Sequence, residues 1–184
     1  MSYDIYCYKS KTNTPNINEA ASALEEMENF QPDMKSQELK TQICKALIDF
    51  NPRLEPFAFD YNEIARLQNI SVDEAKNKFS HIELNTPEGD LATQITIFDN
   101  NVSLTIPYWY TGDKAREVFN KVDQYLKIIN QKAGYFVYDP QTEHAYDPAK
   151  DSLAAIAVYE SVTTQIGKRV SENVTTNKPW WKFW

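Results

Sequence analysis

The chain has 184 residues, of which 42% are hydrophobic and 13% aromatic, and this composition excludes a disordered protein. A chain of this length can bury roughly 70% of its unfolded surface in a single domain. A formal net charge of −7 disfavours direct binding to the phosphate backbone of nucleic acids. Two cysteines, Cys7 and Cys44, are too few for a disulfide framework or a zinc site, and we interpret both as reduced core residues.

Alternating side chains predict the strands of this protein. Tyr3, Ile5 and Cys7 alternate with Asp4 and Tyr6, and usable side chains on both faces favour an interior position in a sheet. The predicted strands cover residues 3–9, 82–84, 91–97, 102–110 and 135–138. Residues 53–60, which follow the predicted helix at 36–50, are interpreted as a connection. Its Leu54, Phe57 and Phe59 are expected to pack against the core.

Apolar side chains at spacings of three and four predict the helices, at residues 18–28, 36–50, 71–79, 112–132 and 148–170. Ser71 and Glu74 form a capping box at the start of the third helix. Gly134 follows the fourth helix as a left-handed cap residue should. Asp147 and Pro148 are expected to cap and open the fifth helix.

These elements predict an α+β protein with one domain over residues 1–172 and a Trp-rich tail over residues 173–184. We expect a mixed five-stranded sheet with helices packed mainly on one face. The first residues carry no signal segment, and the longest apolar run, 153–158, is too short to span a bilayer. We therefore expect a soluble, cytoplasmic protein without stable membrane insertion.

The negative charge is concentrated in the first half of the chain. Residues 1–100 contain 9 Lys and Arg side chains against 17 Asp and Glu side chains. Glu25, Glu26 and Glu28 form the densest acidic patch. This patch is a candidate binding surface for a basic partner, although an acidic face also simply keeps a cytosolic protein in solution.

A second candidate site combines Asp139, Glu143, His144 and Asp147, four polar groups within nine residues. They could hold a hard divalent cation or supply a histidine general base, as in a small metal-dependent hydrolase. A structural interpretation competes with this one, because Asp139 precedes a proline in a turn and Asp147 is placed to cap a helix. We prefer the structural interpretation, and we expect no catalytic residue, no metal ion and no other cofactor.

The tail contains three of the four tryptophans, and its candidate contact residues are Trp180, Trp181, Phe183 and Trp184. An exposed segment of this kind would form an apolar patch of the size that marks an interface. Three readings stay open: the tail folds back on its own domain, it contacts a protein partner or a second copy, or it lies weakly on a membrane surface.

The opening residues 1–6, with the sequence MSYDIY, and residues 134–142, with the sequence GYFVYDPQT, resemble a loose group of small bacterial cytosolic proteins. In that group an MSYD strand begins the domain and a YDPQT turn follows the last sheet strand. Some members look like immunity proteins that accompany polymorphic toxins. The resemblance covers residues 1–148 at most and implies no catalytic residues.

The sequence therefore predicts a non-enzymatic protein-binding module, specifically an immunity-type inhibitor that neutralises a cognate basic toxin through its acidic surface. Complementary charge would speed the capture of such a partner. Two alternatives stay open: the metal-dependent hydrolase, and an assembly adaptor that docks through the Trp-rich tail.

Overall fold

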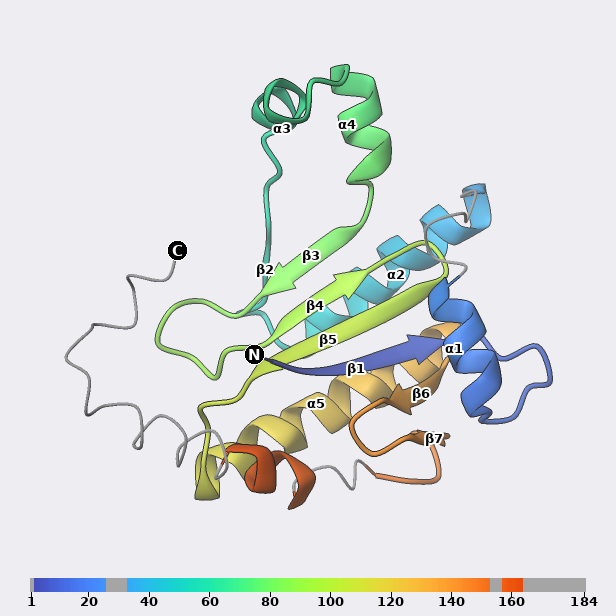
Figure 1. Ribbon diagram of the computed structural model, residues 1–184, viewed down its shortest axis with the longest axis vertical. Coiled ribbons are helices and arrows are strands. Elements are labelled where there is room, and N and C mark those ends of the chain that lie inside the picture. The colour runs from blue at the N-terminus through green and yellow to red at the C-terminus, as the bar shows by residue number, and fades with distance from the viewer. Residues whose placement is uncertain (1, 26–32, 153–156, 164–184) are drawn as a thin grey trace.

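A computed structural model describes residues 2–25, 33–152 and 157–163 of the chain. In this part of the protein, one antiparallel sheet of seven strands has the order β2-β3-β4-β5-β1-β6-β7 (Figure 1). The strands are β1 (Ser2–Tyr8), β2 (Glu55–Pro56), β3 (Ile82–Asn85), β4 (Gln94–Ile97), β5 (Asn101–Pro107), β6 (Phe136–Asp139) and β7 (His144–Tyr146). The labelled helices are α1 (Ile17–Glu25), α2 (Met34–Phe50), α3 (Tyr61–Gln68), α4 (Val72–Lys78) and α5 (Gly112–Ala133). The α+β class predicted from the sequence is confirmed.

The strand β1 lies in the interior of the sheet, between β5 and β6. It pairs with β5 along its whole length, from Ser2 opposite Pro107 to Tyr8 opposite Asn101. On its other edge it pairs with β6, where Cys7 lies opposite Val137. This is the interior position that its two-faced pattern predicts.

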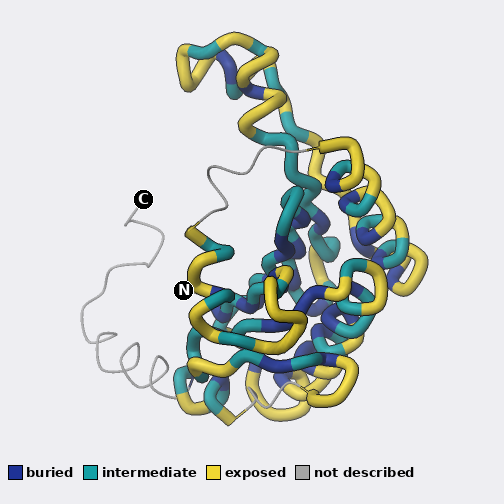
Figure 2. The backbone as a smooth tube through the Cα atoms, turned by 90° about the vertical axis from the view of Figure 1, so that its right-hand side faces the viewer, coloured by how far each residue is buried: buried dark blue, intermediate teal, exposed yellow. Residues whose placement is uncertain are grey.

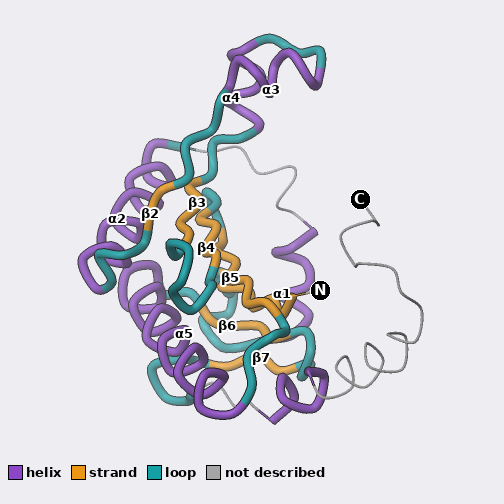
Figure 3. Tube along the Cα trace, turned by 90° about the vertical axis from the view of Figure 1, so that its left-hand side faces the viewer, coloured by secondary structure: helices purple, strands orange, loops and turns teal. Residues whose placement is uncertain are grey.

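The helices α2 and α5 cover one face of the sheet, and the main core lies between these layers (Figure 3). Tyr3, Ile5 and Cys7 of β1 face this core and are at most 1% exposed. The buried stripe of α5 runs from Ala115 to Ile129, at the spacing that its sequence predicts. The opposite face is covered at one end by α1, where Ala20 packs against Tyr8 and Phe136.

The sheet differs from the predicted one in number and direction of strands. It has seven strands instead of five, and every pair is antiparallel instead of mixed. The additional strands β2 and β7 are two and three residues long, and both lie at the sheet edges. Runs this short carry no readable alternation, so the sequence pattern could not reveal them.

Two helix boundaries also differ from the sequence interpretation. The second helix begins at Met34 instead of residue 36, and Asp33 is its N-cap and shares a capping box with Ser36. Residues 148–150 form a single turn, in which the amides of Lys150 and Asp151 donate to the carbonyl of Asp147, and residues 151–152 do not continue it as a helix. Residues 157–163 are helical, and the other residues of the predicted 148–170 helix from 153 onward lie outside the described ones.

The helices α3 and α4 form an arm, defined here as residues 57–81, between β2 and β3. The arm stands away from the sheet and its two covering helices (Figure 1). Most of its residues are exposed, whereas the body contains many buried ones (Figure 2). None of the helices in the described part of the chain has the length and apolarity that a bilayer crossing requires.

Candidate functional site

The acidic patch predicted from the sequence is only partly covered by the structure. Glu25 is exposed and is the last residue of α1. Glu26 and Glu28 lie outside the described residues. Glu38, one turn into α2, is exposed as well and has no cationic partner among the described residues. Glu38 is therefore an exposed acidic residue that the sequence clustering did not include.

The contact residues proposed for the tail, Trp180, Trp181, Phe183 and Trp184, also lie outside the described residues. The same holds for the whole Trp-rich segment 173–184.

Asp139 of the second candidate site is a buried structural carboxylate, with only 2% of its surface exposed. The hydroxyl of Tyr3 donates to its Oδ2 over 2.5 Å, and the amide of Gln141 donates to its Oδ1 over 2.9 Å. The amide of Thr142 approaches the same Oδ1 atom. These bonds close the turn that follows β6 and join it to β1.

The other three members of this candidate site have separate local roles. Glu143 is exposed and adopts a left-handed backbone conformation, with a φ of 50°, in the turn between β6 and β7. The ring of His144 stacks on that of Tyr146. Asp147 accepts from the amide of Ala149 over 3.0 Å and pairs with Lys150. Among the described residues, no three His, Cys, Asp or Glu side chains come together as metal ligands would.

The bond between Tyr3 and Asp139 also connects the two motifs on which the family resemblance depends. Tyr3 belongs to the MSYD strand, and Asp139 belongs to the YDPQT turn. Burial, followed by the hydrogen bond to Asp139, raises the pKa of the Tyr3 hydroxyl far above its ordinary value. Tyr3 therefore stays neutral and donates to the carboxylate at any physiological pH. The two motifs form one structural unit at the centre of the fold.

The arm is stabilised by helix caps and by close contact between its two helices, and not by a large apolar core of its own. Its buried residues are Ala65 and Ala75, whose small side chains let α3 and α4 approach closely. Asp60 caps α3 by accepting from two backbone amides. Ser71 and Glu74 form the capping box predicted for α4.

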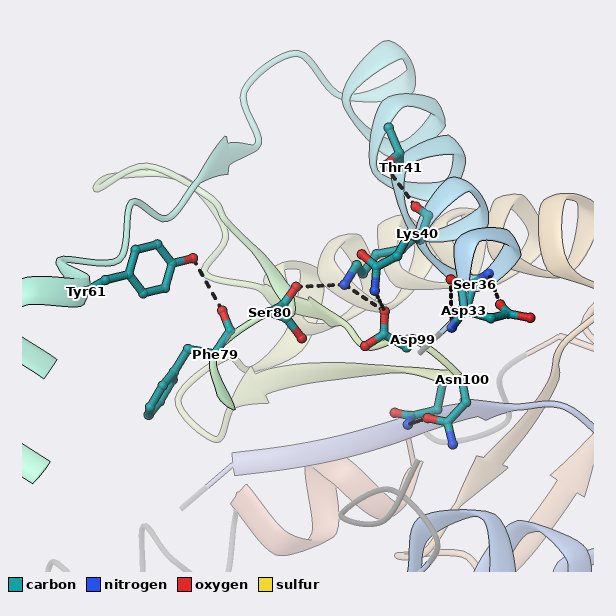
Figure 4. Close-up of polar contacts among 11 residues, drawn as sticks. Asp33, Ser36, Lys40, Thr41, Tyr61, Phe79, Ser80, Asp99 and Asn100 are labelled. Atoms are coloured by element: carbon teal, nitrogen blue, oxygen red, sulfur yellow. Dashed lines mark hydrogen bonds and ion pairs between the residues drawn. The ribbon is translucent and has the colours of Figure 1, made fainter. Parts of the chain in front are cut away.

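A buried ion pair fixes the root of the arm to the body of the protein (Figure 4). Lys40 of α2 is 4% exposed, and its Nζ lies 2.8 Å from Oδ1 of Asp99, in the turn between β4 and β5. The same nitrogen donates to the carbonyl of Ser80 over 2.7 Å. Gln37, one helical turn before Lys40, donates to Asp99 over 2.5 Å. One lysine thus links α2, the β4–β5 turn and the chain that leaves α4.

Aromatic rings continue this connection into the arm. The ring of His81 packs edge-on against Phe59, with centroids 4.9 Å apart, and lies 5.3 Å from that of Phe98. Phe79 completes the cluster. Burial lowers the pKa of His81 below its ordinary value, and the nearby Lys40 acts in the same direction, against the carboxylates Glu83 and Asp99. His81 is therefore a largely neutral packing residue near neutral pH.

Beyond this root, the arm exposes large apolar side chains. Phe57 is 53% exposed and Leu67 is 67% exposed. The prediction that Phe57 tucks against the core is wrong, whereas Leu54, at 3% exposure, does so and Phe59 is half-buried. One sequence signal could have indicated this surface: Leu67 is an apolar residue on the face of α3 that otherwise carries polar side chains. The arm is the candidate functional site of the described protein.

Comparison with known proteins finds no match: no family model, no curated protein and no solved structure is similar to this chain at a significant level.

Proposed function

We propose that this protein is a non-enzymatic protein-binding module, an immunity-type inhibitor that holds a cognate bacterial toxin. The observation that carries the proposal is the arm. It extends Phe57 and Leu67 into solvent on a support that the Lys40–Asp99 pair and the His81 cluster anchor. An anchored support with exposed apolar side chains can bind a partner without first ordering a flexible segment, which lowers the entropic cost of association.

The charge distribution supports a basic partner. The first half of the chain has an excess of eight acidic side chains, since 17 stand against 9 basic ones. Glu25 and Glu38 are exposed in the structure, and Glu26 and Glu28 follow Glu25 closely in the sequence. Such a surface attracts a cationic nuclease-like domain, and the range of this electrostatic attraction becomes shorter as the salt concentration rises. It therefore raises the association rate more than it raises the affinity of the complex.

The resemblance to immunity-like proteins supports the same role. Its two motifs meet in the Tyr3–Asp139 unit, at the centre of the sheet and away from the arm. The shared residues therefore maintain the scaffold, and the surface that would choose the toxin lies elsewhere. A division of this kind suits inhibitors that must each recognise a different partner.

The test is a co-expression experiment with a partner captured from the native host by the full-length protein. The captured protein is expressed alone and together with the wild-type inhibitor, and growth is measured. The double variant Phe57→Ser/Leu67→Ser alters the arm at exposed positions. Met34→Ser, at a position 78% exposed on α2, is the matched control.

We expect the partner to arrest growth alone, and the wild type and Met34→Ser to restore it. The arm variant should fail to restore growth while keeping its melting temperature. A partner that is harmless when expressed alone would contradict the inhibitor proposal. Full protection by the arm variant would contradict the assignment of the arm.

A further inference from the structure

A shallow groove of about 240 Å³, lined by both polar and apolar atoms, lies on the sheet face opposite α2 and α5. Its floor comes from neighbouring strands, where Gln94 of β4 pairs with Thr105 of β5 and with Asn85 of β3. Ser2 of β1 and Trp109, just after β5, add to its walls. Among the described residues, no charged side chain lines it. The described lining residues are therefore uncharged, and the nearest charges are the carboxylates of Asp4 and Glu83, which accept hydrogen bonds from them.

Asp4 sets the direction of the hydroxyl groups in this groove. The hydroxyl of Thr105 donates to its Oδ1 over 2.8 Å, and that of Ser2 donates to its Oδ2 over 3.0 Å. A hydroxyl has one hydrogen to donate, and a carboxylate can only accept. Both hydroxyl oxygens therefore present only lone pairs to a molecule in the groove.

Two amides complete the polar floor. The side-chain nitrogen of Asn85 donates one hydrogen to the carboxylate of Glu83 over 2.7 Å. The side-chain oxygen and the second N–H of Asn85 remain available for a ligand. The side chain of Gln94 makes no hydrogen bond within the described residues, so all its donors and acceptors are available. The floor thus combines several oriented acceptors with a few donors, a set that suits a ligand with many hydroxyl groups.

Trp109 supplies a flat apolar wall beside this floor. Its side chain is 68% exposed, although tryptophan is usually buried for most of its large surface. The face of an aromatic ring carries negative charge density, so it attracts the C–H groups that a sugar ring presents along one side. A ring-shaped ligand could therefore lie on Trp109 and direct its hydroxyl groups toward Gln94 and Thr105.

We propose that this groove binds one neutral sugar residue, either free or at the end of a glycan chain. Its volume lies below the range of 300–1,000 Å³ typical of drug-sized ligands, which limits the occupant to about one ring. A sugar phosphate or a nucleotide does not fit this chemistry, because the groove offers no cation and the protein is acidic. The proposal is independent of the inhibitor function and of the arm.

The test uses the full-length protein labelled with 5-fluorotryptophan, whose Trp109 signal is assigned by ¹⁹F NMR with the variant Trp109→Phe. The probes are the methyl glycosides of glucose, galactose and N-acetylglucosamine, with glycerol as a control for bulk solvent effects. We expect at least one glycoside to shift the Trp109 signal with saturation and a Kd on the order of millimolar, as suits a ligand of about a dozen heavy atoms.

Gln94→Ala is the diagnostic variant, because the side chain of Gln94 makes no hydrogen bond to the described residues and the backbone pairing of β4 is kept. It should weaken binding by about fivefold, the value of roughly one hydrogen bond. Thr96→Ala, two residues along the same strand and on the same face, lies outside the groove and should bind as the wild type does. A trisaccharide that binds much more tightly than its terminal residue would identify a glycan chain as the source.

A linear, non-saturating shift with all three glycosides would overturn the proposal, and so would equal affinities of Gln94→Ala and the wild type. Because the protein must remain folded for either comparison, the urea midpoint of each variant is measured beside the titration.

Discussion

The body of the protein and its arm are stabilised in different ways. The body buries long apolar and aromatic side chains between the sheet, α2 and α5, and many of them are fully inaccessible. The arm buries only Ala65 and Ala75 and depends on helix caps and on its anchored root. The difference shows that a segment can be positioned firmly without a core, provided that its attachment is buried.

The largest effect is expected from the core of the body. Phe119 of α5 is 1% exposed and packs against Tyr3 and Tyr159. Phe119→Ala should lower the free energy of unfolding by about 4 kcal/mol, because the lost contacts leave a cavity. Urea denaturation measures this change. Leu67→Ala, at a position 67% exposed on the arm, is the control and should cost about 0.5 kcal/mol or less, as exposed positions do. Equal costs for both would remove the contrast between body and arm.

The attachment of the arm should come next in size. Lys40→Ala leaves Asp99, which is only 13% exposed, with Gln37 but without its cation, and should cost about 3 kcal/mol. Lys45→Ala removes an exposed pair with Asp49 on the same helix and should cost about 0.4 kcal/mol. The comparison by chemical denaturation isolates the effect of burial from that of losing a lysine. If Lys40→Ala were as mild as its control, the root would not be held by this ion pair.

The caps of the arm should have a smaller and local effect. Ser71→Ala removes the capping box of α4 and should cost about 1 kcal/mol of arm stability. Because α3 and α4 pack mainly on each other, the hydrogen exchange of their backbone amides should become faster. The urea midpoint for unfolding of the body should stay unchanged. Thr111→Ala is the control, because Thr111 precedes α5 without a capping hydrogen bond from its side chain. A shift of the global midpoint by Ser71→Ala would mean that arm and body unfold together.

The smallest effect is expected from His81. Burial is the main cause that lowers the pKa of His81 in the folded protein. Above about pH 6.5 the imidazole is neutral in both the folded and the unfolded chain, so the full stabilisation from packing this ring is present there. Below this pH the unfolded chain binds the proton more readily, and stability falls as the pH drops through the folded pKa. His81→Phe should reduce the loss of stability between neutral and mildly acidic pH. His144→Asn, at an exposed position, should leave the pH profile unchanged. An unaltered profile in His81→Phe would contradict the burial of this ring.

The sequence predicted those elements whose signal is local and long enough to repeat. The alternation of β1 and β5, the stripe of α5 with Gly134 after it, and the Ser71–Glu74 box were all readable, because each depends on neighbouring residues. The two-residue strand β2 depends instead on Glu55 meeting Asn85, and no short pattern encodes that pairing.

The candidate sites were harder to predict for the same reason. Lys40 and Asp99 are separated by 59 residues, and nothing near either one distinguishes it from an exposed charge. Asp139 attracted attention as an acid beside Glu143 and His144, but its partner is Tyr3, 136 residues earlier. Proximity in the sequence suggested a metal site, whereas proximity in space makes Asp139 a support for the first strand.

The central position of β1 has a consequence for how the protein forms. Both strands that pair with β1 come late in the chain, at residues 101–107 and 136–139. At about 5–20 residues per second, a ribosome needs on the order of ten seconds to make the intervening chain. During that time the Tyr and Ile side chains of β1 have no sheet to join. The body therefore closes only after β5 and β6 have been made, and β1 must be kept from pairing elsewhere until these two strands arrive.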